Sequence, residues 1–558
     1  MATATIQNKN FAHFVLIAVF AIIAMVPSYF GGIPIANDQT QHYQFAWTIY
    51  DSVRLGEIYP SLATATNHEF GDYGLRFYPP LTYYGLSLAF FIFQDWYFGS
   101  LIAFTAVFFL GALGVYLWVR DELGPTKGLI AALIYTLAPY HLNQIYNNFL
   151  LAEFFATAII PFCFLFLTRL CRDGRWINAL KLAVAYAALI LVHLPTTILC
   201  SLTMVTFALL ILSKKDLAAR LLKLATAAVA SVIMSSFYWS RWLPELQWIK
   251  HSTPKYFAAT WDYSSNFLLR PSHFANFADD STNMWFADAM LLITLLAAAP
   301  TVVYLISRKI EFSRFLIAVA AVSVAAVFMT TSLSSLIWAN AGFLQKLQFP
   351  SRWLVILSAF VSVFAAVGIE KAARAVNVGR NVLATTGLGF VLLVFFFAAV
   401  FVPKGSVFKS RSQLDQEMTT IPDSEGCECW WPIWAERSAF SQTSKVSAAE
   451  RDVEILQWSP TGRRFAIGPG DPGLASVHAF YYPRWQATVN GAPVEVLPAS
   501  SGAISLPVPT ERSEVDLKFN EAPYVNLANI ASAATWVLVL AFGVILLLKS
   551  RSSMSPQD

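Results

Sequence analysis

The stretch GGIPIANDQTQHYQ, residues 31–44, begins a polar insert that ends at Pro80. The insert directly follows an apolar run, residues 11–30, that is long enough to cross a bilayer. It concentrates the polar side chains of an otherwise apolar region: Asn37, Asp38, Gln39, His42, Arg54, Glu57, His68, Glu69, Asp72 and Arg76. A carboxylate at the mouth of a membrane helix, followed by a polar loop, indicates chemistry at the membrane surface.

The composition is that of an integral membrane protein. Of the 558 residues, 56% are hydrophobic and only 13% are charged, so most side chains must face lipid or other helices. The net charge of +4 is small and spread along the chain, which argues against nucleic acid as a partner. The sequence has no phosphate-binding loop, dinucleotide fingerprint or HExxH helix, so it gives no support to a nucleotide-driven or redox role.

About twenty apolar residues cross a bilayer, and the chain contains about twelve segments that approach this length. The third and fifth are short, as expected of helices packed inside a bundle. The predicted spans are residues 11–30, 98–119, 128–140, 148–170, 178–193, 196–213, 222–243, 286–307, 314–334, 351–370, 382–402 and 527–548. The first lacks an A-x-A-type cleavage site, so we expect it to stay in place as an anchor.

Basic residues orient these spans. If the N-terminus is cytoplasmic, six basic clusters fall on the cytoplasmic side, as the positive-inside rule requires. The clusters are Arg120/Lys127, Arg169/Arg172/Arg175, Lys214/Lys215/Arg220, Arg308/Lys309, Lys371/Arg374/Arg380 and Lys549/Arg551. This orientation requires that residues 81–95 do not cross, so we expect them to form a helix in the outer interface. Both termini are then cytoplasmic.

The outer side should carry a short turn at residues 139–147 and one large polar segment, residues 403–526. In that segment, β-forming runs alternate with Gly, Pro and Asn, and Asn490-Gly491 is a hairpin signal. The expected strands are residues 465–467, 476–482, 486–489, 493–497 and 515–519. We therefore predict an α-helical polytopic membrane protein of about twelve spans with a small extracytoplasmic β-sandwich near the C-terminus. The predicted domains are 1–402 (transmembrane, with a first external loop at 31–97), 403–526 (β-rich) and 527–558 (final span and cytoplasmic tail).

The cysteines and a tryptophan cluster allow more than one interpretation. Cys427 and Cys429 are the only cysteines in a polar region, and their spacing looks too close for a disulfide with each other. No second pair is present for zinc, so inert or partner-linked thiols are the better interpretation. The nearby tryptophans form either a sugar-stacking platform or a membrane anchor, and the anchor is the simpler interpretation. They are Trp430, Trp431 and Trp434.

Two acids are the first candidates for catalysis. Asp38, just after the first span, would act as a general base or bind a divalent cation, unless it is only a solvated loop carboxylate. His42 lies four residues later and would share a helix face with it. Glu153 lies inside an apolar span, where an ionised group is costly unless it faces a polar cavity or partner. The alternative for Glu153 is a hydrogen-bonded helix start.

Further polar residues could bind a substrate. Among these, Arg54 and Arg76 would grip a phosphate, and Glu57 and Asp72 are further loop carboxylates. Pairing among these four at the surface is the simpler alternative. Three further residues lie at the predicted outer ends of spans: His193, Gln348 and Arg352. The Arg352 side chain would either bind a phosphate or only extend to the membrane interface.

Several short motifs in order resemble one bacterial family. They are Asp38 with His42, Leu55-Gly56-Glu57-Ile58-Tyr59-Pro60, Gly71-Asp72-Tyr73-Gly74, Phe77-Tyr78-Pro79-Pro80-Leu81-Thr82-Tyr83-Tyr84, Ala138-Pro139-Tyr140-His141-Leu142, Ala152-Glu153, His193, Leu347-Gln348-Phe349-Pro350-Ser351-Arg352-Trp353, Tyr481-Tyr482-Pro483-Arg484-Trp485 and Val489-Asn490-Gly491. Together they resemble the membrane-protein family described as related to 6-pyruvoyl-tetrahydropterin synthase, which is similar to lipoteichoic-acid glycosylation proteins. The resemblance covers nearly the whole chain.

The resemblance implies a C-type glycosyltransferase (GT-C) fold with a polyprenyl-phosphate sugar as donor and an extracytoplasmic glycan, lipid or protein as acceptor. It implies that Asp38 is the catalytic aspartate, as general base or metal ligand, and that Glu153 is the acid on the fourth helix, which orients acceptor or metal. Whether Mg²⁺ or Mn²⁺ takes part as a cofactor is left open, because three or more oxygen ligands cannot be assigned from the sequence. The resemblance also implies a bacterial inner (plasma) membrane as the location. The predicted substrate-binding residues are His42, Arg54, Glu57, Asp72, Arg76, Tyr78, His193, Gln348 and Arg352. The alternatives are a flippase or transporter of a lipid-linked glycan, or a non-catalytic scaffold that binds glycan through its β domain.

Overall fold

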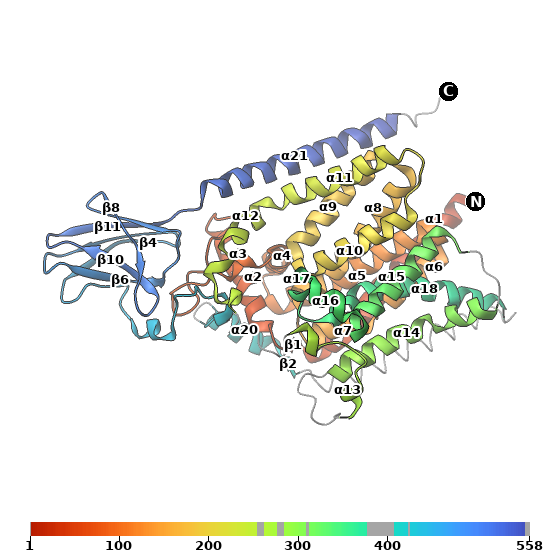
Figure 1. The fold of residues 1–558 in the computed structure, drawn as a ribbon, viewed down its shortest axis with the longest axis horizontal. Coiled ribbons are helices and arrows are strands. Elements are labelled where there is room, and N and C mark those ends of the chain that lie inside the picture. Colours follow the sequence, from red (N-terminus) through yellow and green to blue (C-terminus); the bar gives the residue numbers. More distant parts are fainter. Residues whose placement is uncertain are drawn as a thin grey trace.

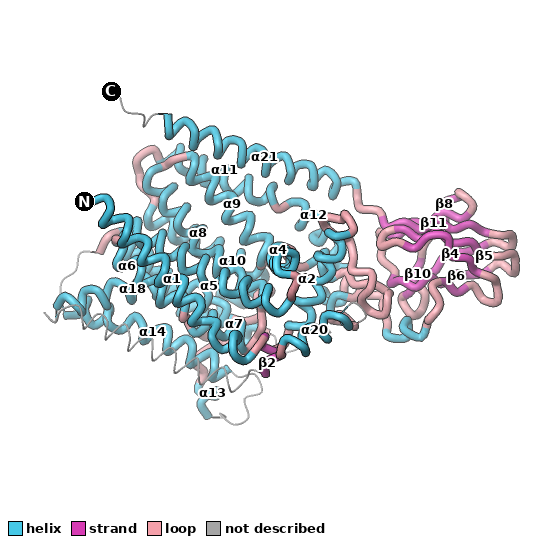
Figure 2. Tube along the Cα trace, turned by 180° about the vertical axis from the view of Figure 1, so that it is seen from behind, coloured by secondary structure: helices cyan, strands magenta, loops and turns pink. Residues whose placement is uncertain are grey.

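The computed structural model of the chain describes residues 2–253, 262–275, 284–307, 312–375, 407–421 and 424–552. It consists of a bundle of long helices with a β domain at one end (Figure 1). The last helix, α21 (Pro523–Ser552), leaves the β domain and runs along the bundle toward the end at which both termini lie (Figure 1). The chain is mostly helical, and its strands are concentrated near the C-terminus, as predicted (Figure 2).

Each predicted span within the described residues contains a helix. These helices are α1 (Ala2–Gly31), α5 (Trp96–Leu123), α6 (Pro125–Thr136), α8 (Leu151–Asp173), α9 (Trp176–Val192), α10 (Leu194–Ile211), α11 (Leu217–Met234), α14 (Met284–Ser307), α15 (Arg314–Thr330), α18 (Leu354–Ala375) and α21. By length and composition, 7 helices of the described part could cross a membrane, and shorter apolar helices accompany them. The predicted span at residues 382–402 lies outside the described residues.

The prediction of a single helix over residues 222–243 is wrong, because the helix is interrupted at Ser235. Helix α11 ends just before this residue, and α12 (Ser236–Glu245) begins just after it. The Trp239 indole donates a hydrogen bond to the Val232 carbonyl oxygen (2.8 Å). Side chains at the break therefore take a carbonyl acceptor that a continuous helix would use, which favours its end at this point.

The turn predicted at residues 139–147 is also wrong, because this segment is a helix, α7 (Pro139–Tyr146). Pro139 stands in its first turn, where the missing N–H has no partner to lose and the fixed φ favours helix. The next helix, α8, begins at Leu151, so Glu153 lies in its first turn. The sequence placed Glu153 inside a span that started earlier.

Residues 31–97, predicted to form the first external loop and called by that name below, contain three helices: α2 (Gln39–Arg54), α3 (Gly74–Phe77) and α4 (Leu81–Phe93). The helix predicted at residues 81–95 is confirmed as α4, which packs against α2 and α5. Its position in the outer interface stays a prediction. The Asp95 carboxylate accepts a hydrogen bond from the Phe98 N–H (2.9 Å) and so caps the start of α5.

Glycines allow α5 to approach α8 closely in the bundle. A Cβ atom at Gly114 would stand 2.8 Å from Cβ of Pro161, and one at Gly111 would stand 3.1 Å from the Thr157 carbonyl oxygen. Any larger residue would push the two helices apart. Because Glu153 lies at the start of α8, this close packing also fixes the height of Glu153 relative to α5.

The β domain is a sandwich of two antiparallel sheets, as predicted, with strand orders β3-β6-β10-β9 and β4-β5-β11-β7-β8. Apolar side chains of both sheets, such as Val477 and Val515, lie in one buried core. The strands are β3 (Val446–Ser447), β4 (Val453–Trp458), β5 (Gly462–Ile467), β6 (Gly473–Phe480), β7 (Trp485–Val489), β8 (Ala492–Val494), β9 (Leu497–Pro498), β10 (Ala503–Val508) and β11 (Ser513–Phe519).

The predicted hairpin at Asn490-Gly491 is confirmed. Strands β7 and β8 pair antiparallel, and φ is 50° at Asn490 and 80° at Gly491, as a tight two-residue turn of this kind requires. Strands β3, β4 and β10 were not predicted. Strand β3 has only two residues, and Pro507 interrupts the pattern of β10. Strand β4 is an edge strand whose four central side chains are all exposed, Glu454 and Gln457 as well as the apolar Ile455 and Leu456, so it lacks the alternation of apolar and polar residues.

Two parts of the first external loop pair with the C-terminal third of the chain. Strand β1 (Ile33–Ile35) forms an antiparallel pair with β2 (Val407–Lys409). Further along the loop, Tyr73 enters the β-domain core, where its ring stacks on Tyr482 at 4.2 Å and its hydroxyl donates to the Phe480 carbonyl oxygen (3.1 Å). The β domain is therefore anchored to the loop as well as to α21.

The prediction that Cys427 and Cys429 do not pair is wrong, because the structure joins them in a disulfide. A 3₁₀ turn follows Cys427, and the N–H of Cys429 donates to its sulfur. The bend brings the two Cα atoms to 5.2 Å, within the range that a disulfide needs. The neighbouring Trp431 is fully buried in the β-domain core, so it forms neither a free sugar platform nor a membrane anchor.

Candidate active site

Four side chains from distant parts of the chain share one electrostatic environment between the bundle and the first external loop. They are Asp38, Tyr78, Glu153 and Arg352, and we call them the Asp38 cluster. Burial raises the pKa of Tyr78 above its usual range, Asp38 and Glu153 raise it further, and Arg352 lowers it. The structure therefore brings together four residues that the sequence singled out separately.

Asp38 is the residue before the first turn of α2, yet its side chain does not cap the helix. Aspartate in this position usually accepts a hydrogen bond from the second or third backbone N–H of the helix. Here the half-buried carboxylate makes no such bond. Burial raises the pKa of Asp38, and the nearby guanidinium of Arg352 partly opposes that rise. The result is a carboxylate with more affinity for a proton than an ordinary surface aspartate.

Glu153 and Arg352 face each other without a full hydrogen bond. Nε of Arg352 lies 3.5 Å from Oε2 of Glu153, and neither atom has a hydrogen-bond partner. The other oxygen of Glu153 accepts a hydrogen bond from the Tyr140 hydroxyl, and Nη1 of Arg352 donates to the Leu347 carbonyl oxygen (2.7 Å). Glu153 is 1% exposed and Arg352 is 12% exposed. Unpartnered polar atoms at such depth are uncommon and call for an explanation.

His42 links three helices and is neutral. Its Nε2 accepts the backbone N–H of Leu151 at the start of α8 (3.2 Å), so the ring proton is on Nδ1 and is donated to the Tyr83 hydroxyl of α4 (2.8 Å). Burial lowers the pKa of His42 to about 3, although a backbone contact opposes it. At neutral pH His42 is therefore a fixed link beside Asp38.

Of the other predicted site residues, His193 and Gln348 lie near Arg352, whereas Arg54 does not. His193 is buried in the turn between α9 and α10, hydrogen-bonded to Thr196 (2.7 Å), and the charge of Arg352 acts on it. Gln348 lies in the turn before Arg352, with φ at 65°. Arg54 is exposed and pairs with Asp51 one turn earlier on α2 (2.9 Å).

Glu57 and Asp72 lie away from the Asp38 cluster. Oε1 of Glu57 accepts the Ser61 N–H (3.4 Å). Asp72 is buried, with one carboxylate oxygen bound to the Gly74 N–H (2.7 Å) and the other, Oδ2, without a partner. A Cβ at Gly426 would stand 2.5 Å from that second oxygen, so the segment before Cys427 covers Asp72 closely.

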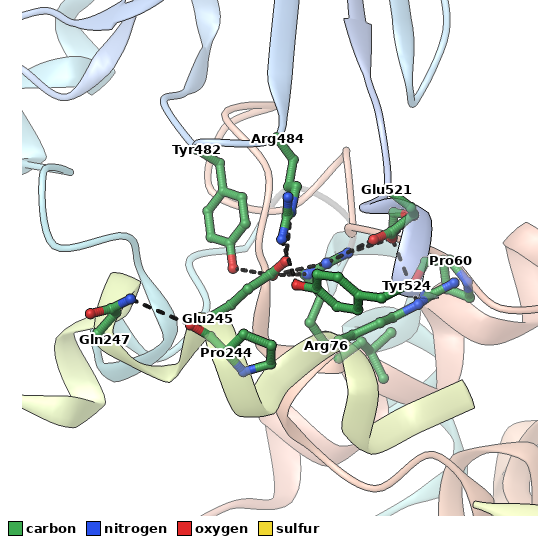
Figure 3. Close-up of polar contacts among 12 residues, drawn as sticks. Pro60, Arg76, Pro244, Glu245, Gln247, Tyr482, Arg484, Glu521 and Tyr524 are labelled. Carbon is green, nitrogen blue, oxygen red and sulfur yellow. Dashed lines mark hydrogen bonds and ion pairs between the residues drawn. The ribbon is translucent and has the colours of Figure 1, made fainter. Parts of the chain in front are cut away.

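Arg76 lies at the centre of a buried ion-pair network that joins the first loop, α12, the β domain and the start of α21 (Figure 3). Its guanidinium donates to Glu245 (3.0 Å) and to both oxygens of Glu521 (2.6 and 3.0 Å). Glu245 also accepts from Tyr482 and Arg484, each at 2.7 Å. We call these five residues the Arg76 network. All three guanidinium nitrogens of Arg76 are therefore engaged with carboxylates, and the side chain is fully buried, which does not suit a phosphate site.

The described residues contain no group of three or more His, Cys, Asp and Glu side chains placed to hold a metal ion. Asp38 and Glu153, the predicted metal ligands, supply two carboxylates, and Arg352 acts on both. Two carboxylates would hold Mg²⁺ or Mn²⁺ only with water or substrate oxygens completing the coordination. A metal is therefore compatible with this pair only if water or a substrate supplies the remaining oxygens.

The family follows from a direct match. Residues 75–405 match the family model described as a 6-pyruvoyl-tetrahydropterin synthase related domain of membrane proteins. The chain belongs to this family. The match contains Tyr78, Glu153, His193 and Arg352, but it begins after Asp38.

A curated relative, an uncharacterized protein of Lactococcus lactis subsp. cremoris, is 26% identical over 218 residues, which cover 37% of this chain and 34% of that protein. Among solved structures, the chain is similar to the oligosaccharyltransferase of Archaeoglobus fulgidus in its apo form (TM-score 0.39, 12% identity, 75% of this chain and 56% of that one). It is also similar to ArnT from Cupriavidus metallidurans bound to undecaprenyl phosphate (TM-score 0.41, 13% identity, 73% and 75%). At these scores neither likeness carries an argument about function.

Several residues of the site were missed from the sequence. Tyr140 and Tyr83 lie within motifs that carried the resemblance, but nothing marked their hydroxyls as partners of Glu153 and His42. Glu245 follows a proline at the end of α12 and gave no signal at all. Its partners lie far away in the sequence, so only the folded chain reveals them.

Proposed function

We propose that this protein is a membrane glycosyltransferase that moves a sugar from a polyprenyl-phosphate donor to a hydroxyl of an extracytoplasmic acceptor. The observation that carries the proposal is the Asp38 carboxylate, which caps no helix, is raised in pKa by burial, and lies beside Arg352. A base and a cation in one site are what this transfer requires. The family resemblance implies the same chemistry.

In the proposed reaction, the acceptor oxygen forms a bond to C1 of the sugar while the bond from C1 to the phosphate oxygen breaks. Asp38 takes the proton of the acceptor hydroxyl, and the electron pair of the broken bond leaves with the polyprenyl phosphate. Arg352 stabilises the negative charge that develops on the leaving phosphate. If Mg²⁺ or Mn²⁺ binds, it supplies further positive charge at the same phosphate.

We assign Glu153 a positioning role. Its hydrogen bond from Tyr140 fixes its orientation, and its free oxygen faces Nε of Arg352 at 3.5 Å. This arrangement holds the guanidinium by charge yet leaves Nε and Nη2 available to phosphate oxygens. Arginine binds phosphate well through such a pair of donors.

The orientation of the protein completes the proposal. Both termini lie at the end of the bundle opposite the β domain (Figure 1). Two of the basic residues predicted to be cytoplasmic form ion pairs with acidic residues, Arg169 with Asp121 (2.6 Å) and Lys127 with Glu370 (2.6 Å). In the proposed orientation the end of the bundle with both termini is cytoplasmic, as the positive-inside rule favours, and the β domain and the Asp38 cluster face the outside of a bacterial inner membrane.

The test is transfer from a panel of radiolabelled polyprenyl-phosphate sugars by the purified full chain, with and without added Mg²⁺ or Mn²⁺. We expect Asp38→Asn to lower kcat by about 10²- to 10⁴-fold without loss of folding. Asp51→Asn is the control, because Asp51 lies on the same helix and pairs only with Arg54 at the surface. Equal transfer by wild type and Asp38→Asn would remove Asp38 as the base. Movement of the donor across vesicles without breakage of its C1–O bond would indicate a flippase instead.

A further inference from the structure

The turn that carries Asp38 is held from both sides by one distant segment, residues 407–420. Before the turn, Ile33 to Ile35 pair with Lys409 to Val407 in the β1–β2 ladder. After the turn, the first residues of α2 contact α20 (Arg411–Thr420). Asp38 therefore lies between two anchored points, and both belong to a part of the chain that follows the bundle.

Four side chains make the second anchor. Glu417 accepts a hydrogen bond from the Thr40 hydroxyl (2.8 Å) and another from the Gln39 amide (3.2 Å). Lys409 donates to Glu417 and to the side-chain oxygen of Gln39, each at 2.5 Å. We call Gln39, Thr40, Lys409 and Glu417 the clamp. Glu417 and Lys409 are only 15% and 16% exposed, so these bonds are partly shielded from water.

The helix that presents Glu417 is itself fixed. Ser410 and Gln413 form a capping box at its start. On its buried face, Leu414 and Met418 lie in the same apolar core as Ile33. The clamp therefore joins α2 to a rigid element, because α20 is secured by its cap and by its packing.

We propose that Glu417 and Lys409 are positioning residues that hold the Asp38 carboxylate away from the α2 N-terminus and ready to meet the acceptor. The inference rests on the proposed function. By binding the two side chains that follow Asp38, the clamp fixes the first turn of α2 while the β1–β2 ladder fixes the chain before it. Without the clamp, the Asp38 carboxylate would turn back to cap α2. Its oxygen would then accept a backbone N–H of the helix and would not be available to the acceptor.

The first test compares kcat and KM of Glu417→Ala, Glu417→Gln and Asp415→Asn in the full chain. A base displaced by about 1 Å loses roughly 10²-fold in rate, so we expect Glu417→Ala to lower kcat by about 10- to 100-fold with little change in KM. Glu417→Gln keeps one acceptor oxygen for Thr40 and should recover part of that loss. Asp415→Asn is the control, because Asp415 is exposed on the same helix and faces only Arg411 (3.9 Å). Unchanged kcat in Glu417→Ala would overturn the inference.

The second test does not depend on activity. Hydrogen exchange of the backbone amides of residues 36–44 should become faster in Glu417→Ala than in wild type, and should not change in Asp415→Asn. Unchanged exchange in Glu417→Ala would overturn the clamp. If wild type transfers no sugar but exchange follows this pattern, the proposed function fails and the clamp stands as architecture. If Asp38→Asn abolishes transfer but Glu417→Ala changes neither readout, the proposed function stands and the clamp fails.

Discussion

The Asp38 cluster and the Arg76 network each place two carboxylates around arginine, but they use their atoms differently. In the Arg76 network all four oxygens of Glu245 and Glu521 accept hydrogen bonds, at 2.6 to 3.0 Å from their arginine donors. In the Asp38 cluster the shortest pair, Arg352 to Glu153, stands at 3.5 Å with both atoms unpartnered. The first group is complete without a ligand, and the second is not.

This difference distinguishes charged residues that stabilise the fold from charged residues that can act on a substrate. A buried charge whose partners are all supplied by the chain serves the fold, because its removal leaves other charges exposed to an apolar interior. A buried charge with unused hydrogen-bonding capacity keeps its field available for a substrate that arrives later. The sequence presents Arg76 and Arg352 as equal candidates for a phosphate, and only their surroundings distinguish them.

The largest effect on stability should come from the complete group. Arg76→Met leaves Glu245 and Glu521 without their shared cation, and we expect it to lower the free energy of unfolding by about 3–5 kcal/mol. Heat unfolding in detergent, followed by tryptophan fluorescence, measures the change. Arg54→Met is the control, because its exposed pair with Asp51 should contribute less than about 1 kcal/mol. Equal midpoints for Arg76→Met and wild type would mean that the network does not hold the domains together.

The incomplete group should respond in activity and pH dependence. We expect Arg352→Gln to lower kcat by about 10²-fold, since it removes the cation at the leaving phosphate. Arg352 also lowers the pKa of Asp38, so its loss raises that pKa further. Because a base works only when deprotonated, the acidic limb of the pH–rate profile should move to higher pH in Arg352→Gln. A limb that stays in place would separate Asp38 from Arg352.

Asp72 is intermediate in its hydrogen bonding, because one carboxylate oxygen has a partner and the other has none. Its substitution should have the smallest effect of the three. Burial raises its pKa to about 6, although the Gly74 N–H and the nearby Asn67 side chain both lower it. A raised pKa favours the protonated form in the folded state, so stability falls as pH rises from the ordinary value of Asp through about 6. We expect Asp72→Asn to be more stable than wild type by about 1–2 kcal/mol at pH 7.5 and equal to it near pH 3.5, measured by chemical unfolding. A variant that is less stable at pH 7.5 would indicate a cation paired with Asp72.

The sequence predicted the spans because a bilayer imposes a length and an apolar composition that few other structures share. It also predicted the sandwich and its Asn490-Gly491 turn from local patterns. The errors arose where a short-range interaction determined the backbone conformation. At Ser235 a side-chain hydrogen bond favours the end of a helix, and at Pro139 the proline favours the start of one. A hydropathy pattern reports neither effect. At Cys427 a tight turn brought together two sulfurs that spacing alone had kept apart.

Site residues could be nominated but not sorted. Asp38, Glu153 and Arg352 stood out because each charge lies next to or within an apolar span. Arg76 stood out as one of the charged residues of the polar insert, and yet its partners Glu245 and Glu521 lie 169 and 445 residues away. No local pattern reveals a pairing at that range, so the division between network and cluster needs the fold.

Thr40 and Glu417 are 377 residues apart in the sequence, so their contact can form only late in the synthesis of the chain. At about 5–20 residues per second, the ribosome finishes Glu417 roughly 20–75 s after Thr40. For that time the segment with Asp38 lacks its second anchor, while most of the helices of the bundle are made. The turn that carries Asp38 can therefore become fixed only late in synthesis, after the segment that follows the bundle has been made.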